Sequence, residues 1–504
     1  MALFLGYDVG TSGTKAVLLD AQWRVVAEAV APHSLAHPRT GWAEQAPEEW
    51  LAAAATTTRA LLDSARAQAS DVKAIAFAGQ MLTLVPMDAG GRATRPAIAW
   101  MDDRGDAEAQ QIVRRLGGDR IVKTLAGALP TGKDLVAKVA WLKTREPAIY
   151  ERTRVFGDAT SWLVARTTGK VALDPTAAGA TGLFDAESRS WSKPLAWLAG
   201  FPLDRLAPLS PSTSAAGRLH AEGAATLGLA EGTIVATGLA DIPAMAVGTG
   251  ATADGEAHLY LGTSAWIVCA SDHPRPRPDR GVAVIPSAAA RGGLIVGECE
   301  TAGACRAWAL RLLGLRDDED SAFDAMVDAS PPGARGLLFC PWLFGERAPF
   351  PDSMLRGAFV GMTLDHGRAD LARAVLEGVA MNLKLVHEAM EASIAARSPL
   401  RVSGGGALSD AWLQILADVI GRPLERVAQP RVAGAVGAAL VAAVAHGTLR
   451  SLEDARSAVK IDRRFEPRSA ARAIYAPAVQ ALRELAAPLS RASALLRGNA
   501  GPVT

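Results

Sequence analysis

The sequence contains little that is typical of a secreted, metal-cluster or membrane protein. Its 504 residues include only four cysteines, Cys269, Cys299, Cys305 and Cys340, and none forms a Cys-x-x-Cys pair. A structural zinc site or a disulfide framework is therefore not expected, and free thiols fit a reducing compartment. No apolar run approaches the roughly 20 residues of a membrane-spanning helix. We expect no membrane partner.

An excess of charge of one sign is also missing. Lysine and arginine total 53 and aspartate and glutamate 52, so the net charge is +1. No overall field attracts nucleic acid, and no basic tail is present. The first residues are an apolar stretch that predicts a strand rather than a signal peptide. We expect a cytoplasmic protein that binds no nucleic acid.

The composition and the length favour a globular protein of more than one domain. Hydrophobic residues make up 49% of the chain and charged residues 21%, which is ordinary for a globular protein. A chain of this length is too long for one core. The order of a strand meander, a helix, and further strands and helices occurs twice, which favours an α/β protein of two similar lobes. We place the junction so that the domains are 1–247 and 248–504.

The tripeptide Gly-Thr-Ser occurs at residues 10–12 and again at 262–264, half a chain apart. Both copies lie between apolar stretches, so each predicts a hairpin turn. Bare backbone N–H groups and two hydroxyls in such a turn suit phosphate oxygens. The repeat indicates a duplicated domain with a nucleotide held between the copies, although a hairpin turn alone also favours glycine and serine.

Two aspartates follow apolar strands. Asp8 ends the first strand beside the Gly-Thr-Ser turn, where a carboxylate would repel phosphates unless Mg²⁺ lay between them. Lys15, on the return strand, adds positive charge. Asp241 opens a helix, where it is either an N-cap or a general base that takes a proton from a hydroxyl during phosphoryl transfer. On Asp8 alone, a plain turn-capping role is favoured, and for Asp241 the two interpretations are balanced.

Two further groups of residues predict ligand contacts. The three glycines at 404–406 follow a strand and precede a helix, which favours a nucleotide contact over a simple tight turn. A set of mostly polar or aromatic side chains in the first half lies at strand ends or, for Glu44 and Gln45, in a loop. Together they suit a polyhydroxylated ligand, whereas each alone predicts ordinary surface polarity. These side chains are Glu44, Gln45, Gln80, Met81, Trp100, Asp102 and Arg104. Residues 154–218 are rich in Pro, Gly, Trp and Asp and predict a loop-rich section.

In this order, the motifs resemble those of the FGGY carbohydrate kinases, most closely the xylulokinase branch. The resemblance spans nearly the whole chain. It rests on residues 7–15, 42–50, 238–250, 261–264, 345–349 with 356–357 and 361, and 403–412. It implies an actin-like, ribonuclease H-like duplicated fold with an interdomain cleft, and a last helix that packs back on the N-terminal lobe.

The resemblance also implies ATP and Mg²⁺ as cofactors and assigns roles to residues. Asp241 is the expected catalytic base and Asp8 the Mg²⁺ ligand. The expected ATP contacts are Thr11, Ser12, Lys15, Thr263, Gly303, Gly405, Gly406 and Asp410. The expected substrate contacts are Gln80, Met81, Trp100 and Asp241. The oligomeric state is left open, with a homodimer as one expectation.

The predicted reaction is ATP-dependent phosphorylation of a hydroxyl of a small sugar or polyol, with a ketopentose such as D-xylulose as the first choice. Leu82 departs from the histidine that xylulokinases usually carry there, which removes a hydrogen bond from the sugar site. The substrate could therefore also be another ketose, a polyol, glycerol or a sugar acid. Lys133 is weak evidence for an acidic substrate. An actin-like nucleotide-binding scaffold is the alternative of a different class, and Asp241 argues against it.

Overall fold

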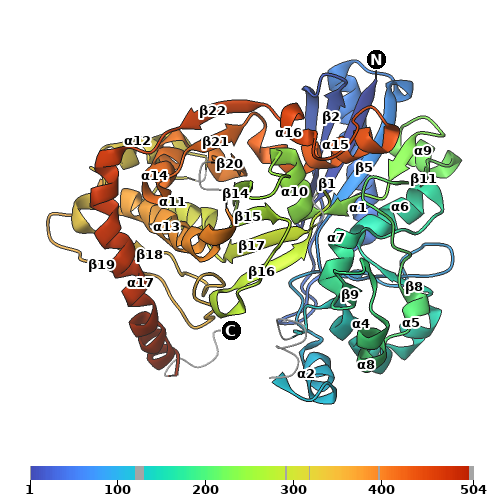
Figure 1. Cartoon of the computed structure of the whole chain (residues 1–504), viewed down its shortest axis with the longest axis horizontal. Helices are drawn as coiled ribbons and strands as arrows, with labels where there is room; N and C mark the ends of the chain where they lie inside the picture. The colour runs from blue at the N-terminus through green and yellow to red at the C-terminus, as the bar shows by residue number, and fades with distance from the viewer. Residues whose placement is uncertain (1, 120–129, 290–291, 317, 395–397, 499–504) are drawn as a thin grey trace. The chain divides into compact units, whose positions relative to one another are not determined.

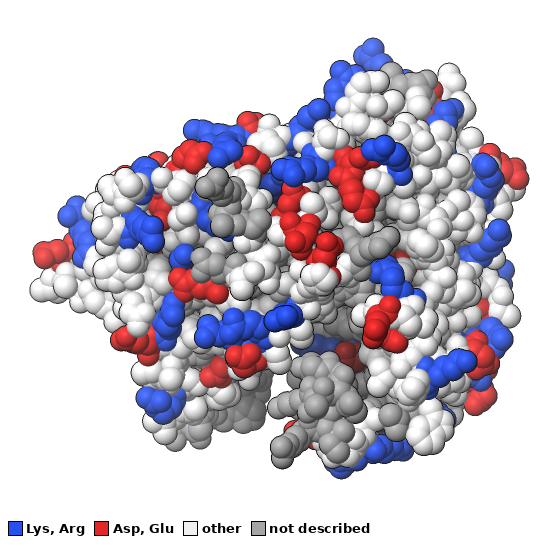
Figure 2. All heavy atoms as spheres, viewed as in Figure 1, with Lys and Arg blue, Asp and Glu red and all other residues white. Residues whose placement is uncertain are grey.

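The computed structural model describes residues 2–119, 130–289, 292–316, 318–394 and 398–498 (Figure 1). The chain forms two compact units, and neither is continuous in sequence. Unit 1 consists of Met1–Thr252, Ile285–Arg291 and Val432–Val459, and unit 2 of Ala253–Val284, Gly292–Arg431 and Lys460–Thr504. Lysine and arginine side chains are interspersed with acidic ones over the face seen in Figure 2.

Unit 1 is built on a mixed sheet in the order β11-β12-β5-β1-β2-β3, with β13 also paired to β5. Its first three strands form the predicted antiparallel meander, while β5, β12 and β13 run parallel to β1. The strands are β1 (Leu3–Val9), β2 (Gly13–Asp20), β3 (Val25–Pro32), β5 (Val72–Gly79), β11 (Ala215–Arg218), β12 (Ile234–Ala236) and β13 (Leu239–Ala240).

Helices cover both faces of this sheet. Alternate residues of β1 point to opposite faces, so Leu5 and Tyr7 pack with α1 (Pro47–Ala65) and α6 (Ala159–Thr168), whereas Phe4 packs with α10 (Asp241–Thr249) and α15 (Ala433–His446). Every residue of β1 is buried, which explains why the strand is apolar apart from Asp8 near its end.

The section 154–218 contains short helices among its turns and loops. They are α6, α7 (Pro175–Ala178) and α8 (Lys193–Ala199). Asp158 and Ser161 form a capping box at the start of α6, and that spacing was an available signal. The other elements are β4 (Glu44–Gln45), β6 (Val85–Met87), β7 (Ala97–Ile98), α2 (Asp106–Arg115), α4 (Leu135–Arg145), α5 (Pro147–Arg152), β8 (Val155–Gly157), β9 (Phe184–Asp185), β10 (Ser190–Trp191), α9 (Ala221–Leu227) and α16 (Ala455–Ala458).

Unit 2 repeats the strand plan of unit 1. A hairpin of β14 and β15 has an antiparallel strand, β17, on one side and parallel strands β20 and β21 on the other, in the order β16-β17-β15-β14-β20-β21-β22. The duplication predicted from the two Gly-Thr-Ser turns is confirmed. The strands are β14 (Ala257–Leu261), β15 (Ala265–Ser271), β16 (Val282–Pro286), β17 (Gly293–Cys299), β20 (Leu400–Ser403), β21 (Leu424–Val427) and β22 (Ile461–Phe465).

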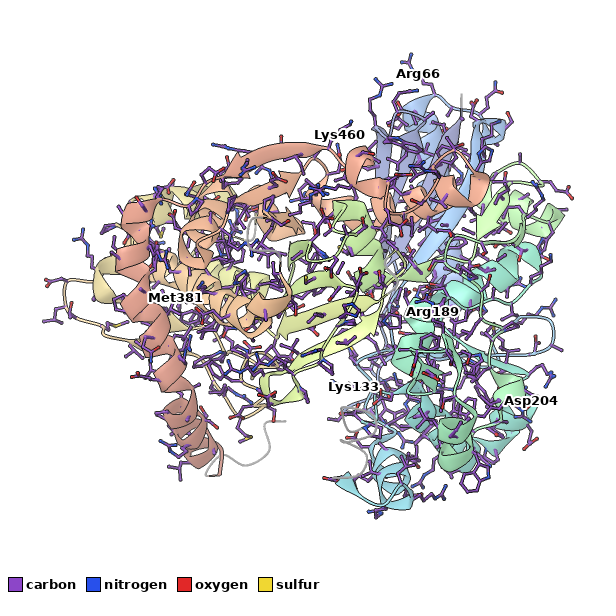
Figure 3. The ribbon with its side chains drawn as sticks, viewed as in Figure 1. Arg66, Lys133, Arg189, Asp204, Met381 and Lys460 are labelled. Atoms are coloured by element: carbon purple, nitrogen blue, oxygen red, sulfur yellow. The ribbon has the colours of Figure 1, made fainter. Side chains whose placement is uncertain are left out.

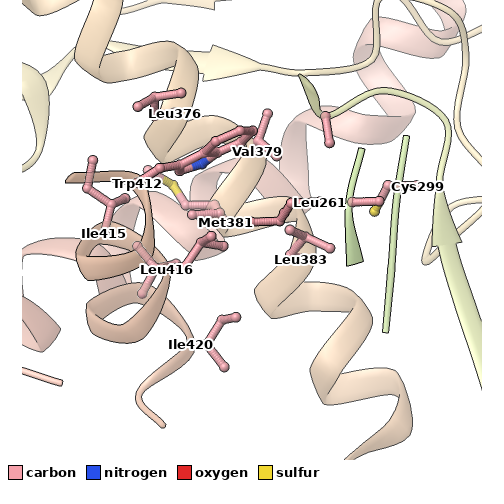
Figure 4. Close-up of a cluster of buried hydrophobic side chains, with 14 of the residues drawn as sticks. Leu261, Cys299, Leu376, Val379, Met381, Leu383, Trp412, Ile415, Leu416 and Ile420 are labelled. Atoms are coloured by element: carbon pink, nitrogen blue, oxygen red, sulfur yellow. The ribbon is translucent and has the colours of Figure 1, made fainter. Parts of the chain in front are cut away.

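The core of unit 2 lies between its sheet and its helices. Trp412 and Leu416 of α14 lie beside Val379 and Leu383 of α13 (Figure 4). The last helix, α17, also packs here, and Tyr475 donates a hydrogen bond to Glu377 Oε1 at 2.7 Å. The helices are α11 (Gly303–Leu312), α12 (Asp320–Asp328), α13 (Arg368–Met390), α14 (Asp410–Ile420) and α17 (Ser469–Gly498), with two short strands, β18 (Leu338–Cys340) and β19 (Ala358–Val360).

The C-terminal segment of unit 1 is therefore α15, whereas the last helix packs in unit 2. The prediction had a single boundary at 247/248 and the last helix on the N-terminal lobe. Residues 432–459 are needed in unit 1 because they cover the face of β1 that carries Phe4. Among the described residues, none of the helices combines the length and apolarity needed to cross a bilayer.

Candidate active site

The carboxyl ends of three parallel strands bring predicted site residues together in unit 1. Val9 of β1 pairs with Gly79 of β5, and Gly79 pairs with Ala240 of β13. Gln80 and Asp241 directly follow two of these positions, and Asp8 directly precedes the third. Residues from three distant stretches of the chain thus meet at one sheet edge, the usual place for a ligand in an α/β sheet.

Asp8 lies against the first turn of α15. Its side chain is on the same face of β1 as Phe4, and a Cβ atom added to Gly434 would be 2.7 Å from Asp8 Oδ2. The residue is 6% exposed. Burial raises the pKa of Asp8, while Lys15, paired with it across the β1–β2 hairpin, opposes that shift.

The donor set at Asp8 fits Mg²⁺ better than a metal held by protein alone. The described residues contain no group of three or more His, Cys, Asp or Glu side chains able to hold a metal ion. Mg²⁺ commonly binds through one or two carboxylates, with phosphate oxygens and water as its other ligands. A single buried carboxylate beside a Gly-Thr-Ser turn meets that description.

The first Gly-Thr-Ser turn is closed by a hydrogen bond from Gly10 N to Gly13 O at 3.1 Å. Trp100 Nε1 donates to Thr11 Oγ1 at 2.9 Å, which places Trp100 at the predicted site and fixes its ring. Ser12 is exposed. The indole N–H of Trp100 is therefore bonded to the turn, and the face of the Trp100 ring is the part suited to contact a ligand.

The polar groups near Trp100 bind one another rather than facing solvent. Asp102 is fully buried, accepts from Ala43 N at 2.6 Å and from Arg104 Nη2 at 2.7 Å. Arg104 also donates to Glu44 Oε1 at 2.7 Å and lies 3.9 Å from the ring centre of Trp42. These residues are not ordinary surface polarity, because they form a buried network that ties residues 43–44 to the loop after Trp100.

Lys138 is a residue that the sequence interpretation missed. Its side chain is fully buried in α4, and Nζ donates to Leu82 O at 2.7 Å and to Ala99 O at 2.8 Å. Leu82 has a φ of 61°, an uncommon conformation for a residue with a side chain. Burial lowers the pKa of Lys138 to about 7. The lysine lies between Leu135 and Leu142 on an apolar helix face, and that spacing was the available signal.

Met81 and Leu82 lie beside a small, mostly apolar cavity. Asp158 is one of its few polar groups, and burial raises the pKa of this carboxyl to about 6. No histidine lines the cavity. Its lining residues are Met81, Leu82, Thr83, Leu135, Gly157, Asp158, Leu173, Ala177, Ala180 and Thr181.

Asp241 is the first residue of α10 and not its N-cap. The N-cap is Ala240, and α10 has no side-chain cap, so the plain capping role weighed for Asp241 is not what this helix uses. Asp241 Oδ1 accepts from the N–H of Ile242 at 2.9 Å. Its side chain is half-buried.

The backbone before Asp241 is held by α7. Ala240 N donates to Thr176 Oγ1 at 2.9 Å. The Thr176 hydroxyl in turn bonds to Asp174, which also accepts from Ser212 Oγ at 2.8 Å. Thr176 and Asp174 are 0% and 1% exposed. A buried chain of hydrogen bonds therefore fixes where Asp241 leaves the sheet.

In unit 2, the second Gly-Thr-Ser turn lies against the start of α11. Gly303 N donates to Gly262 O at 2.8 Å, and Thr263 O accepts from Ala302 N at 2.9 Å and Ala304 N at 3.0 Å. A Cβ atom at Gly303 would be 2.4 Å from Gly262 O, so only glycine allows this approach. The structure brings Thr263 and Gly303 together.

The glycine-rich segment lies on the same part of unit 2. Gly404 has a φ of 95°, and a Cβ there would be 2.3 Å from Leu261 O, one residue before the turn. Gly406 packs against Trp412, whereas a Cβ at Gly405 would meet nothing within 4 Å. Asp410 accepts from Arg426 Nη1 at 2.7 Å and is also bonded to Arg463. Of the three glycines, Gly405 has the open surface that a ligand needs.

The segment 345–349, one of the family motifs, forms a buried polar network in unit 2. Glu346 is 4% exposed and accepts from Asn382 Nδ2 at 2.6 Å and Glu300 N at 2.9 Å. Burial raises the pKa of Glu346 to about 8. Arg347 donates to Glu298 Oε2 at 2.6 Å. These contacts tie the loop to the end of β17, four residues before Gly303.

Models of both domains of one protein family match the chain. The N-terminal domain of the FGGY family of carbohydrate kinases matches residues 3–248, and its C-terminal domain matches residues 257–446. The chain belongs to the FGGY family of carbohydrate kinases. It is an ATP-dependent sugar kinase with an actin-like α/β fold, and the scaffold alternative is set aside.

Individual relatives agree with this assignment. The chain is 32% identical to xylulose kinase of Escherichia coli (strain K12), over 96% of this chain and 98% of that protein. It is 27% identical to gluconokinase of Bacillus subtilis (strain 168), over 82% of each. The crystal structure of a xyloylose kinase from Brucella ovis superimposes with a TM-score of 0.88 at 29% identity, covering 97% of this chain and 99% of that one.

Proposed function

We propose that this FGGY kinase phosphorylates a hydroxyl of a ketopentose, with D-xylulose as the first candidate. The meeting of Asp8, Gln80 and Asp241 at one sheet edge carries the proposal, since it supplies a metal ligand, a neutral polar group and a base side by side. The similarity to the xylulose kinase of Escherichia coli supports the choice of sugar.

Asp241 acts as the general base. Its carboxylate takes the proton of the attacking sugar hydroxyl as the oxygen bonds to the γ-phosphorus and the bond to ADP breaks. The hydrogen bond from Ala240 N to Thr176 supports this role, because it holds the backbone next to the base in one place. Positioning of this kind contributes to catalysis directly.

Asp8, Lys15, Thr11 and Ser12 serve the phosphates. Asp8 would hold Mg²⁺, which when bound neutralises phosphate charge. Lys15 lies across the hairpin from Asp8 and adds positive charge to the same end of the sheet. The N–H groups and hydroxyls of the Gly-Thr-Ser turn donate to phosphate oxygens.

In unit 2, we assign Thr263 to the phosphates of the nucleotide and Gly303, Gly405 and Gly406 to adenosine. The open surface at Gly405 supports this assignment. Asp410 stays among the proposed adenosine contacts. Its two arginine partners set the direction of its carboxylate.

A sugar acid is the second candidate. Position 82 is leucine, whereas a histidine is expected there in an enzyme that binds xylulose. The chain is also 27% identical to a gluconokinase. Lys133, just before α4, is a surface cation of unit 1 (Figure 3). A carboxylate of the substrate would favour such a partner.

A coupled assay of ADP release distinguishes these substrates. Ketopentoses, tetruloses, polyols, glycerol and gluconate are compared by kcat/KM at saturating Mg²⁺ and ATP. The highest value on D-xylulose is the expected result. A higher value on gluconate would replace the ketopentose by a sugar acid and leave the kinase assignment intact. Light scattering in the same buffer tests the predicted homodimer.

A further inference from the structure

A buried glutamine links two of the residues assigned to the site, Thr11 and Gln80. Gln45, in the short strand β4, is 2% exposed. Its Nε2 atom donates to Thr11 O at 2.8 Å and to Ser34 O at 3.0 Å, and its Oε1 atom accepts from Gln80 Nε2 at 2.7 Å. Thr11 also receives the indole N–H of Trp100. Gln45 therefore joins the first phosphate turn to Gln80.

The partners of Gln45 determine which way both amides point. The carbonyl oxygens of Thr11 and Ser34 can only accept, so the Gln45 atom that faces them must be its NH₂ group. Its oxygen is then the atom that meets Gln80, and that oxygen requires a donor. Gln80 must therefore donate to that oxygen from its own NH₂ group. The Oε1 atom of Gln80 is left buried with no hydrogen-bond partner among the described residues.

The position of Gln80 makes this unpartnered oxygen informative. Gln80 follows β5, which lies between β1 with Asp8 and β13, the strand before Asp241. The Gln80 oxygen at this edge is therefore an acceptor that the described residues leave unsatisfied. A buried acceptor without a partner costs about 1–3 kcal/mol, so a bound hydroxyl that donates to it gains affinity over a group that cannot.

We infer that Gln45 is a positioning residue for specificity: it fixes the Gln80 amide with its oxygen available, so that this part of the site recognises a substrate O–H as a hydrogen-bond donor. Groups that only accept, such as a ketone, a carboxylate or a fluorine, are disfavoured at that place. The inference rests on the proposed sugar-kinase site. It adds that the substrate group facing Gln80 must be a hydrogen-bond donor.

Deoxyfluoro analogues of the best substrate test this directly, because fluorine replaces the hydroxyl in size but cannot donate. The wild-type enzyme, Gln45→Met and Gln80→Leu are assayed with one analogue for each hydroxyl that is not phosphorylated. In the wild type, we expect one position where fluorine lowers kcat/KM about tenfold or more, the effect of one lost hydrogen bond. In both variants, the hydroxyl and fluorine forms at that position should differ by less than about twofold.

A double-mutant cycle separates positioning from general damage. If Gln45 acts through Gln80, adding Gln45→Met to Gln80→Leu lowers kcat/KM no further. Gln111→Met, at an exposed glutamine of α2, is the matched control and should keep wild-type values. Thermal melts confirm that each variant folds. If Gln45→Met does not fold, the fluorine comparison with Gln80→Leu decides the result alone.

Three results would overturn the inference. In the first, Gln80→Leu discriminates between hydroxyl and fluorine as strongly as the wild type does. In the second, adding Gln45→Met to Gln80→Leu lowers kcat/KM by as much as Gln45→Met does alone, and in the third no position discriminates and the Mg²⁺ requirement shifts. The last would mean that a metal-bound water is the donor. A wild-type enzyme inactive on every sugar, polyol and acid tested would instead overturn the proposed function.

Discussion

At the scale of single residues, Asp8 and Asp241 differ from other aspartates only in what surrounds them. Asp8 is buried opposite Lys15 and against the first turn of α15. Asp241 begins a helix that it does not cap. The fold alone does not require either aspartate, because a strand end accepts many residues and Asp241 does not cap its helix. The roles that we propose for Asp8 and Asp241 account for both choices.

Replacing the proposed base tests the mechanism. Asp241→Asn keeps the size of the side chain and removes its basicity. We expect kcat to fall by about 10²–10⁴-fold, the usual contribution of a positioned base. Stopped assays of sugar phosphate measure kcat, and calorimetry measures the Kd for ADP, which should stay within about twofold because phosphate binding is retained.

The control for this variant is Asp204→Asn. Asp204 is exposed and forms one long ion pair with Arg154 at 3.4 Å (Figure 3), so its loss should leave kcat unchanged. Near-normal turnover of Asp241→Asn would contradict the assignment of Asp241 as the general base.

Lys138 should make stability depend on pH. Its pKa is about 7 in the folded protein and 10.5 as the reference value. Between these pH values the unfolded chain binds one more proton, so the free energy of unfolding rises with pH, by up to roughly 1.4 kcal/mol per unit. Below pH 7 both states carry the proton and this effect stops changing.

Urea unfolding of the wild type and Lys138→Met at several pH values between 6 and 9 measures this effect. The variant removes the titrating group at a similar size. The unfolding free energy of the wild type relative to the variant should be flat below pH 7 and climb above it. A difference that stays constant to pH 9 would show that the folded lysine keeps an ordinary pKa.

At the scale of elements, the short helix α7 fixes the start of α10. Thr176→Val removes the hydroxyl that accepts from Ala240 N and leaves that N–H buried without a partner. We expect a loss of about 1–3 kcal/mol in unfolding free energy, and a lower kcat with an unchanged KM for ATP, since the phosphate turn is untouched. Urea unfolding and steady-state kinetics measure the two effects.

Thr176→Ser is the matched control because it keeps the hydroxyl and drops only a methyl group. It should restore most of kcat and of stability. If the valine variant matches the wild type in both quantities, the hydrogen bond does not position Asp241.

The elements that sequence predicted best are those with strong local signals. The meander of β1, β2 and β3 and the hairpin of β14 and β15 follow from apolar runs around small-residue turns. Helix α6 was missed because its surroundings are rich in Pro and Gly, although its Asp158–Ser161 capping box was visible. Gln45 was grouped with possible ligand contacts because its inward orientation depends on carbonyls at Thr11 and Ser34, which no local pattern reveals.

At the scale of the whole molecule, unit 1 is completed by residues far along the chain. Helix α15 covers the face of the sheet that includes Phe4 and Val17, and its first turn lies against Asp8. A protein of residues 1–252 alone would keep α10 on that apolar face but would leave the part under α15 uncovered. We expect it to be insoluble or to lack a cooperative melt, because exposed apolar sheet surface promotes association.

The test joins residues 432–459 to residue 252 through a flexible Gly/Ser linker. This linked version of unit 1 should be soluble and melt cooperatively by circular dichroism. A linker of the same length without the added segment is the control. Cooperative melting of residues 1–252 without α15 would contradict the assignment of this segment to unit 1.

The sequence by itself determined the duplicated α/β plan, the two Gly-Thr-Ser turns and the residues that mark the family, because these depend on local periodicity and on short motifs. The tertiary structure alone decided that α15 completes unit 1, that Lys138 holds the carbonyls of Leu82 and Ala99, and that Gln45 orients Gln80. Each of these is a contact between residues distant in the chain, and its outcome depends on burial and on which polar partner lies within hydrogen-bonding distance.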